Sequence, residues 1–259
     1  MLRPELHGID GLAVDLDGVL YEHDAPIRGA VQTIALLQRR QVPFRFVTNT
    51  TSIGRRRIAD RLSQIGFMAS AQEVFCPAHA AAEHLRRECA SAALFVQDGT
   101  LEEFADVRCD ADRPDAVVIG DLGEGWTFER LNAAFRLVHE GARLIALGRS
   151  RYWRKAGALQ LDVGPFVAAL ECATGRQALV FGKPDPAFFG SVVDDLGLPA
   201  RRVAMIGDDI VTDVGAAMQA GLFGVLVRTG KFRESDLDGP IRPDLVMGSL
   251  ADVIAGTST

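Results

Sequence analysis

Residues 11–20, GLAVDLDGVL, decide the fold of this chain. The apolar run from Gly11 to Val14 predicts a buried strand, and two carboxylates follow it at Asp15 and Asp17. Side chains two positions apart on a strand point to the same side, and Gly18 permits a sharp turn. Two acids beside an apolar core are costly without a cation. The stretch therefore predicts a cation site at a strand end, although an Asp-Gly turn with a solvated acid fits these ten residues equally well.

Composition limits the classes of protein that the chain can belong to. Its 259 residues suffice for one large domain or two moderate ones. A net charge of −6 argues against a general nucleic-acid binder. The four cysteines lack CxxC spacing, which indicates reduced, mostly buried thiols in the cytoplasm. No apolar run approaches the length of a membrane span. We therefore expect a cytoplasmic protein with neither a nucleic acid nor a membrane as partner.

Apolar runs alternate with helical patterns along the whole chain, which predicts a parallel sheet covered by helices on both faces. The expected fold is α/β, a doubly wound, Rossmann-like sheet. The runs that predict strands are Gly11–Leu16, Pro43–Val47, Ala92–Val96, Ala116–Ile119, Leu144–Leu147, Ala178–Phe181, Val203–Ile206 and Gly224–Val227. Ligands bind outside the carboxyl ends of the strands in such sheets.

Polar residues of a particular kind follow some of these runs. They are the acids Asp15 and Asp17, then Thr48 and Asn49, then Lys183, and finally Asp208 and Asp209 with Asp213 close behind. The runs between positions 92 and 148 end without a comparable hydroxyl or lysine. This contrast predicts a separate α/β unit at residues 78–179, inserted into a core domain formed by residues 1–77 and 180–259.

The residue types at these strand ends suit phosphoryl transfer. Carboxylates are the ligands that Mg²⁺ prefers, and a lysine offsets the charge of a phosphoryl group. A threonine hydroxyl supplies a further hydrogen bond, while a carboxylate can attack phosphorus. The set predicts Mg²⁺-assisted transfer through an aspartyl-phosphate.

Four motifs, DLDGV, FVTNT, GKP and GDDIVTD, occur in this order. They resemble the four motifs of the haloacid dehalogenase-like hydrolases, and the insertion between the second and third resembles the larger α/β cap of the NagD-like branch. Each motif alone is weak, but the ordered set is specific.

The resemblance implies a role for each matching residue. Asp15 corresponds to the nucleophile and a metal ligand. Asp17 corresponds to the general acid and base, with its backbone carbonyl as a ligand, and Asp208 to the remaining ligand of Mg²⁺. The phosphate-binding positions correspond to Thr48, Asn49 and Lys183. Asp213 corresponds to an acid that holds Lys183 or metal-bound water, and Asp209 either assists it or simply starts a helix.

The segment GRSRYWRKAG in the expected cap combines cations with aromatic residues. Arg149, Arg151 and Trp153 could recognise an anionic or aromatic part of the substrate, or the segment could be a solvated basic loop. A cap favours small phosphorylated metabolites over macromolecules, and relatives often form homodimers through it.

The sequence is compatible with three functions. The preferred one is a phosphatase for small phosphate esters. The second is cleavage of P–N or pyrophosphate bonds, which is implied by the similarity of residues 148–175, 180–189, 205–221 and 227–236 to one member of the family. The third is a phosphoaspartate signalling module, whose receiver domains are about half this length.

Overall fold

The computed structural model describes residues 2–155 and 158–255, and they form two compact units. The first unit comprises Met1–Thr48, Arg56–Phe75 and Lys183–Thr259, and the second comprises Asn49–Arg55 and Cys76–Gly182. Within the described ranges no helix is both long enough and apolar enough to cross a membrane.

The first unit is built on a six-stranded sheet in which every pairing is parallel. Its strand order is β14-β13-β12-β1-β4-β5. The strands are β1 (Gly11–Asp15), β4 (Phe44–Val47), β5 (Val74–Phe75), β12 (Val203–Gly207), β13 (Phe223–Val227) and β14 (Leu245–Met247). Strands β1 and β12 are buried along their whole length, which explains why they read as continuous apolar runs.

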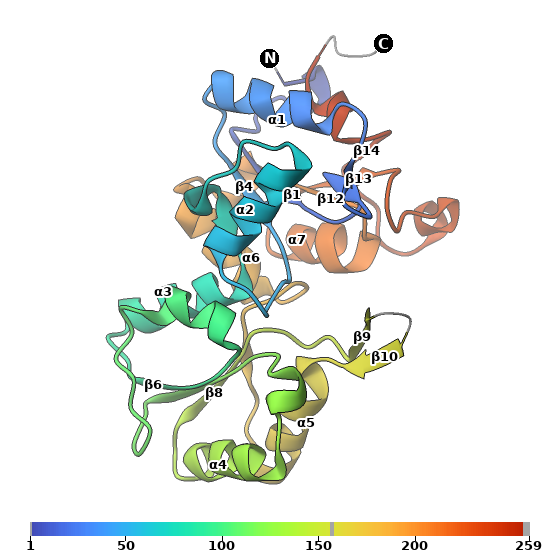
Figure 1. Cartoon of the computed structure of the whole chain (residues 1–259). Helices are drawn as coiled ribbons and strands as arrows, with labels where there is room; N and C mark the ends of the chain where they lie inside the picture. Colours follow the sequence, from blue (N-terminus) through green and yellow to red (C-terminus); the bar gives the residue numbers. More distant parts are fainter. Residues whose placement is uncertain (1, 156–157, 256–259) are drawn as a thin grey trace. The chain divides into compact units, whose positions relative to one another are not determined.

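Along the chain, the strands that follow β1 (β4 and β5) are added on one side of the sheet, and those that follow β12 (β13 and β14) are added on the other. Because parallel crossovers are right-handed, the helices of the two halves cover opposite faces, as the doubly wound prediction requires. Helices α1 (Ala30–Arg39) and α2 (Arg55–Ile65) belong to one half (Figure 1). The other half carries α6 (Pro186–Leu196) and α7 (Ala216–Gln219), which follows the π-helical turn Ile210–Gly215. The predicted fold class is therefore confirmed.

Local sequence explains where these helices begin and which face they bury. Helix α1 buries Ala30, Thr33, Ile34 and Leu37, the spacing of one helix face. Helix α6 begins where the Asp185 side chain accepts a hydrogen bond from the Ala187 N–H, with Pro186 in its first turn. It ends at Gly197, which has a left-handed backbone conformation.

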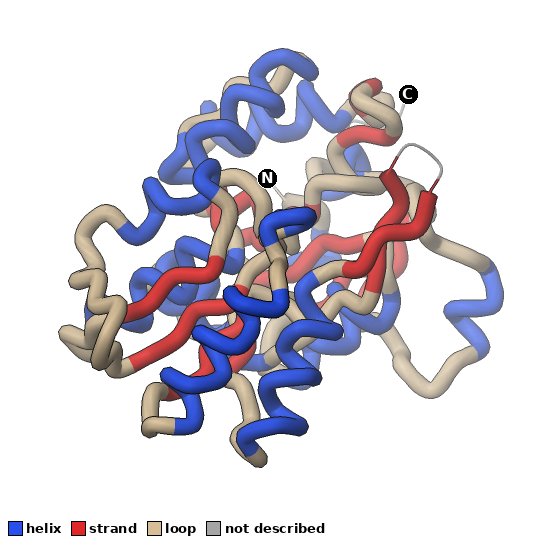
Figure 2. Tube along the Cα trace, turned by 60° about the horizontal axis from the view of Figure 1, so that its bottom comes forward, coloured by secondary structure: helices blue, strands red, loops and turns tan. Residues whose placement is uncertain are grey.

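The second unit has its own four-stranded parallel sheet, in the order β11-β8-β7-β6. Its strands are β6 (Ala92–Phe95), β7 (Ala116–Ile119), β8 (Arg143–Ala146) and β11 (Leu179–Val180), and its helices are α3 (Pro77–Arg87), α4 (Phe128–His139) and α5 (Val163–Thr174). Two short antiparallel pairs complete the structure: β2 (Tyr21–Glu22) with β3 (Ala25–Pro26) in the first unit, and β9 (Tyr152–Lys155) with β10 (Ala158–Leu161) in the second. Figure 2 shows β9 and β10 as adjacent strands, drawn in red.

The structure corrects two sequence-based expectations. The run Ala178–Phe181 forms only the two-residue strand β11, and it pairs with β8 of the second unit. Lys183 therefore begins the returning segment of the first unit and does not end one of its strands. A short apolar run fits an edge strand of either sheet, which is why the sequence pattern did not show to which sheet this strand belongs.

The thiols are also not mostly buried: Cys76 is buried, but Cys89, Cys109 and Cys172 are exposed.

The second unit spans a wider range than the expected insertion at 78–179, and it includes residues 49–55. Hydrogen bonds within the unit explain this. The Gly54 N–H donates to the Gly99 carbonyl at 2.7 Å, and the Thr100 hydroxyl donates to the Thr51 carbonyl at 3.0 Å.

Candidate functional site: a buried carboxylate cluster with one lysine

Three buried carboxylates and one buried lysine meet in the first unit. One carboxylate oxygen from each of Asp15, Asp208 and Asp213 lies within 4.8 Å of the others. The Lys183 Nζ lies 2.7 Å from Asp15 Oδ1 and 2.7 Å from Asp213 Oδ1. All four residues are at most 7% exposed. Lys183 can offset only one of the three negative charges, so the site has an excess of negative charge in a poorly solvated place.

The pKa values reflect this excess. Burial raises the pKa of Asp208 to about 6, and burial followed by repulsion from Asp15 raises that of Asp213 to about 6. Burial also raises the pKa of Asp15, against the attraction of Lys183. Burial alone would lower the pKa of Lys183, but Asp15 and Asp213 together raise it above its usual value. The cluster therefore favours a cation.

Asp208 is held so that one of its oxygens remains available. The backbone N–H of Lys231 donates to Asp208 Oδ2 at 2.7 Å. In the described part of the chain, the buried Asp208 Oδ1 has no hydrogen-bond partner. A buried acceptor without a donor costs free energy, and a hard divalent cation with oxygen ligands, such as Mg²⁺, would satisfy it. The residues present therefore fit such an ion.

Asp17 differs from Asp15 in its surroundings. Strand β1 ends at Asp15, so the alternation of strand side chains does not extend to Asp17, which is exposed in the following turn. The Tyr21 hydroxyl donates a hydrogen bond to Asp17, and burial and then the Asp17 charge raise the pKa of Tyr21. Tyr21 is a neighbour of the site that the sequence motifs did not indicate.

Thr48 and Asn49 follow β4 at the carboxyl edge of the same sheet, but the two residues fall in different units. Thr48 is 4% exposed and belongs to the first unit, where its N–H donates to the Phe75 carbonyl at 3.2 Å. Asn49 begins the segment that packs with the second unit. There its side-chain oxygen lies close enough to Gly182 to contact a Cβ built on that glycine at 3.5 Å.

Asp209 and Asp213 separate into two roles. Asp209 caps the turn Ile210–Gly215, since its Oδ1 accepts from the N–H groups of Val211 and Thr212, both at 3.0 Å. Its Oδ2 lies 3.6 Å from the Lys231 Nζ. Asp213 is 1% exposed and pairs with Lys183 inside the cluster. Asp209 is thus a helix-start acid at the rim, while Asp213 is part of the buried set.

The basic and aromatic residues expected to read the substrate lie in the second unit. Arg149 forms a two-point ion pair with Glu171, at 3.0 and 2.5 Å. Arg151 lies with its guanidinium 6.0 Å from the centre of the Tyr152 ring. Tyr152 is 56% exposed and Trp153 is 42% exposed on the hairpin of β9 and β10. Arg149 is therefore engaged within its unit, and Trp153 is partly exposed.

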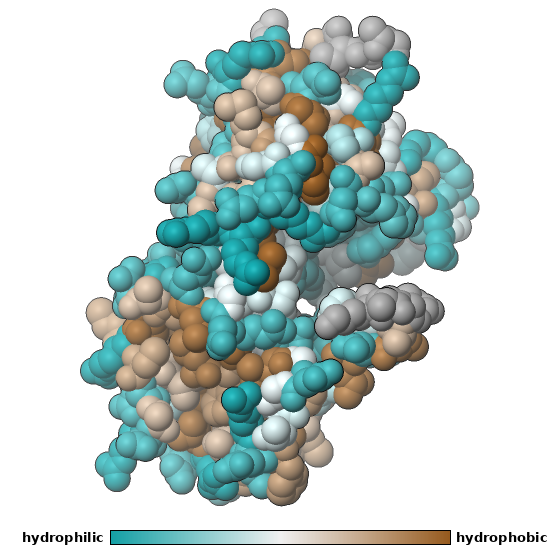
Figure 3. Space-filling view, viewed as in Figure 1, coloured by the Kyte–Doolittle hydropathy of each residue, from teal (hydrophilic) through white to brown (hydrophobic). Residues whose placement is uncertain are grey.

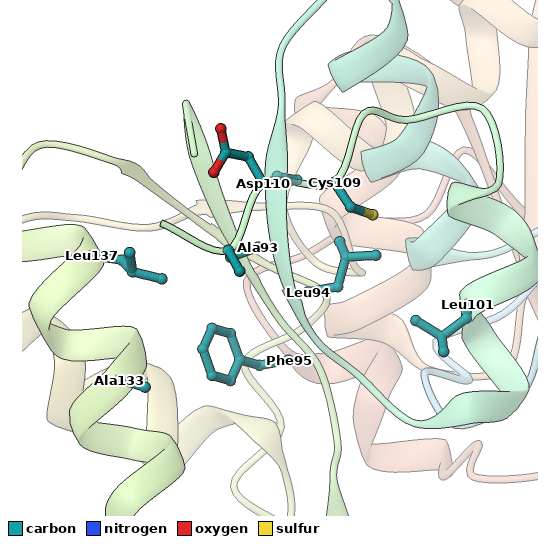
Figure 4. A pocket seen from close by; sticks show the side chains of 10 residues that line it. Ala93, Leu94, Phe95, Leu101, Cys109, Asp110, Ala133 and Leu137 are labelled. Carbon is teal, nitrogen blue, oxygen red and sulfur yellow. The ribbon is translucent and has the colours of Figure 1, made fainter. Parts of the chain in front are cut away.

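A separate cavity in the second unit does not have the character of a catalytic site. It has a volume of about 430 Å³ and lies at strand β6. The side chains of Ala93 and Phe95 project from one side of this strand and that of Leu94 from the other side (Figure 4). Most of its lining is apolar, and Asp110 is the one charged residue among the residues that line it. No group of convergent polar side chains of the kind found around Asp15 lines this cavity.

Comparisons with known proteins place the chain in a family. The model for haloacid dehalogenase-like hydrolases matches residues 12–109, and a second model, for HAD-hydrolase-like domains, matches residues 180–253. The chain belongs to the haloacid dehalogenase-like hydrolases and is a phosphatase.

Relatives and solved structures agree with this assignment. The human phospholysine phosphohistidine inorganic pyrophosphate phosphatase is 40% identical over 256 residues, with 96% of this chain and 94% of the relative covered. Human haloacid dehalogenase-like hydrolase domain-containing protein 2 is 40% identical, with 88% and 87% covered. The 4-nitrophenylphosphatase of Thermotoga maritima superposes with a TM-score of 0.88 at 27% identity, covering 99% of this chain and 100% of that one. NagD from E. coli superposes with a TM-score of 0.86 at 26% identity, covering 95% and 98%.

Proposed function

We propose that this phosphatase transfers the phosphoryl group of a small substrate to Asp15 and then hydrolyses the aspartyl-phosphate. The observation that carries the proposal is the position of Asp15, a buried carboxylate 2.7 Å from Lys183 and beside two further carboxylates. A carboxylate in such a place can act as a nucleophile toward phosphorus. The adjacent lysine offsets charge that develops on the phosphoryl oxygens.

We propose that the cofactor is Mg²⁺, held by the side chains of Asp15 and Asp208 and by the backbone carbonyl of Asp17. Asp208 Oδ1, which has no hydrogen-bond partner among residues 2–155 and 158–255, supports this assignment. When bound, the ion would offset negative charge on the phosphoryl group and on the carboxylates. Asp213 serves a different purpose, because its pairing with Lys183 keeps the ammonium directed at Asp15.

The reaction then has two steps. In the first, an oxygen of Asp15 forms a bond to phosphorus while the bond from phosphorus to the leaving oxygen breaks, and Asp17 gives a proton to that oxygen. In the second, Asp17 takes a proton from a water molecule, whose oxygen attacks phosphorus and releases Asp15. The exposed position of Asp17 supports this role, since a general acid and base exchanges protons with substrate and water.

Thr48, Asn49 and Lys183 would bind the phosphoryl oxygens during both steps. Thr48 and Lys183 are both almost fully buried, so their donors would act where water competes little. Asn49 belongs by its contacts to the second unit. We therefore propose that the second unit, which includes the expected insertion at 78–179, is a substrate-selecting cap.

The substrates that we propose are small phosphorylated metabolites. Hydrolysis of P–N or pyrophosphate bonds is the alternative, supported by the name of the human relative at 40% identity. The exposed Trp153 and the adjacent Arg151 would contact the leaving group. Arg151→Ala and Trp153→Ala should change the ratio of kcat/KM values between substrates, whereas an equal loss for every substrate would contradict this role. Arg149, paired with Glu171, would act through that ion pair.

We also propose that two copies associate through their second units, in the cytoplasm. Nine large apolar side chains of the described residues are exposed, and seven of them are in the second unit: Leu101, Phe128, Tyr152, Trp153, Leu159, Leu161 and Leu179. Figure 3 shows apolar residues gathered on the visible face of this unit. Such surfaces are typical of protein contacts. Light scattering during size exclusion tests the dimer, and a monomer would contradict it.

The three exposed free thiols support the proposed cytoplasmic location, because thiols stay reduced in a reducing compartment.

One experiment separates the enzyme from a phosphoaspartate signalling module. The protein is incubated with Mg²⁺ and a panel of substrates that includes p-nitrophenyl phosphate, phosphorylated metabolites, pyrophosphate and a phosphoramidate. Multiple turnovers are expected, and the panel identifies the bond that is cleaved. Stoichiometric labelling of the protein without turnover would favour the signalling module.

A further inference from the structure

A loop that none of the four motifs contains lies against the carboxylate cluster. It is formed by Thr229, Gly230 and Lys231, one residue beyond the end of β13. Lys231 donates its backbone N–H to Asp208 Oδ2 at 2.7 Å. Thr229 donates its hydroxyl to the carbonyl of Gly18 at 2.5 Å, in the turn that follows Asp15 and Asp17. The loop thus joins the turn after β1 to the carboxylate after β12.

The backbones of the loop and the turn approach so closely that both need glycine. Gly18 has a φ of +80° and Gly230 a φ of +63°. A Cβ on Gly18 would lie 2.9 Å from the Gly230 Cα, and a Cβ on Gly230 would lie 2.6 Å from the Gly18 Cα. Either Cβ would also collide with Asp208 Oδ2. The Asp208 carboxylate is therefore enclosed between two glycines, which leaves little room for another side-chain orientation.

The enclosure decides which oxygen of Asp208 is available. Oδ2 is occupied by the Lys231 N–H, while the buried Oδ1 lacks a hydrogen-bond partner in the described ranges. On the outer side of the loop, the Gly230 N–H donates to Glu22 Oε1 at 2.8 Å. The side chains of Thr229 and Glu22 thus hold the loop Thr229–Lys231 in place. The backbone of this loop in turn orients the carboxylate of Asp208.

We propose that the loop Thr229–Lys231 positions Asp208 for the divalent cation, with Thr229 as its main positioning residue and Glu22 as a support. The inference rests on the proposed function, because it assumes that Asp208 binds the ion. Residues that orient a metal ligand commonly change metal affinity about 10–100-fold when they are replaced. Because the Thr229 hydroxyl donates to the Gly18 carbonyl, we assign Thr229 a positioning role and not a catalytic one.

The test measures Mg²⁺ binding to the full-length protein by calorimetry, without substrate. Thr229→Val removes the hydroxyl but keeps the shape, and it should weaken Mg²⁺ binding by about 10-fold or more. Thr229→Ser keeps the donor and should restore the affinity. Thr33→Val is the matched control, because Thr33 is a buried threonine of α1 in the same unit. It should leave Mg²⁺ affinity unchanged even if it lowers the melting temperature.

Glu22→Ala keeps the proposal testable if Thr229→Val fails to fold, since Glu22 is exposed and its loss removes only a surface contact. It should weaken Mg²⁺ binding in the same direction, and Glu22→Gln should recover it. Asp208→Asn locates the ion. If Asp208→Asn lowers the affinity while Thr229→Val and Glu22→Ala do not, the positioning role is wrong and the proposed site stands. If Asp208→Asn binds Mg²⁺ as well as the wild type does, both are wrong.

Discussion

The ammonium of Lys183 lies 2.7 Å from Oδ1 of Asp15, although the two residues are 168 positions apart in the sequence. Both side chains are almost fully buried. A buried charge without a partner is costly. The ion pair offsets part of the free-energy cost of burying each of the two charges. The same contact places a positive charge where a phosphoryl group on Asp15 would need one.

Lys183→Met should therefore lower kcat/KM by about 100–1000-fold, the usual effect of removing one preorganised group that stabilises developing charge. Steady-state kinetics with p-nitrophenyl phosphate measures it. Arg45→Met is the matched control, because Arg45 also pairs with an aspartate of the first unit, Asp195, at a more exposed position. Equal activity of the Lys183→Met variant and the wild type would contradict the role of Lys183.

Asp17→Asn should remove proton transfer while it leaves the nucleophile in place. General acid–base catalysis contributes about 10²–10⁴-fold, and the loss should be largest for leaving groups that need a proton. The ratio of kcat/KM for an alkyl phosphate to that for p-nitrophenyl phosphate should fall in this variant. A uniform loss across both substrates would indicate that Asp17 acts in some other way.

Mg²⁺ binding should weaken as the pH falls through about 6, where the pKa values of Asp208 and Asp213 lie in the metal-free protein. These pKa values are raised on folding, so protonation of the two carboxyls favours the folded state at low pH. That contribution is lost as the pH rises through 6, and protons compete with Mg²⁺ below it. Titration of the melting temperature with Mg²⁺ should give weaker binding at about pH 5 than at about pH 7. Equal affinities would contradict the prediction.

Glu103 should matter for the stability of the second unit. It is 5% exposed and accepts hydrogen bonds from both the backbone N–H and the Nε of Arg55, at 2.7 and 2.8 Å. Glu103→Ala leaves the half-buried backbone and side-chain donors of Arg55 without this acceptor and should cost about 1–3 kcal/mol of unfolding free energy. Asp115 likewise accepts two hydrogen bonds from one residue, Ser91, but its side chain is 54% exposed. Asp115→Ala should cost clearly less in denaturant unfolding, and equal losses would show that burial of Glu103 does not matter.

The sequence predicted the fold class and the residues that the structure gathers in the cluster, because both depend on apolar periodicity and on acids at strand ends. Asp15 ends β1 and Asp208 follows β12, so the rule that ligands bind at the carboxyl ends of parallel strands predicted both at one edge of the sheet. That β1 and β12 are paired neighbours is known from the structure. Lys183 was predicted both from the GKP motif and as the end of a core strand, and the second argument was wrong, because the preceding strand pairs in the second unit. Thr229 and Gly230 lie in residues 227–236, which resemble one family member, but the resemblance gave them no role. Their contacts, like that of Tyr21, depend on a hydroxyl or a backbone approach that only the tertiary structure shows.

The most direct test of the central claim is intact-mass measurement after the protein is mixed with acetyl phosphate and Mg²⁺ and quenched in acid. In the Asp17→Asn variant the aspartyl-phosphate should form and decay slowly, and peptide mapping should locate the phosphate on Asp15. The double variant Asp15→Asn with Asp17→Asn should carry no phosphate. A phosphate adduct on the double variant, or on any residue other than Asp15, would contradict the account.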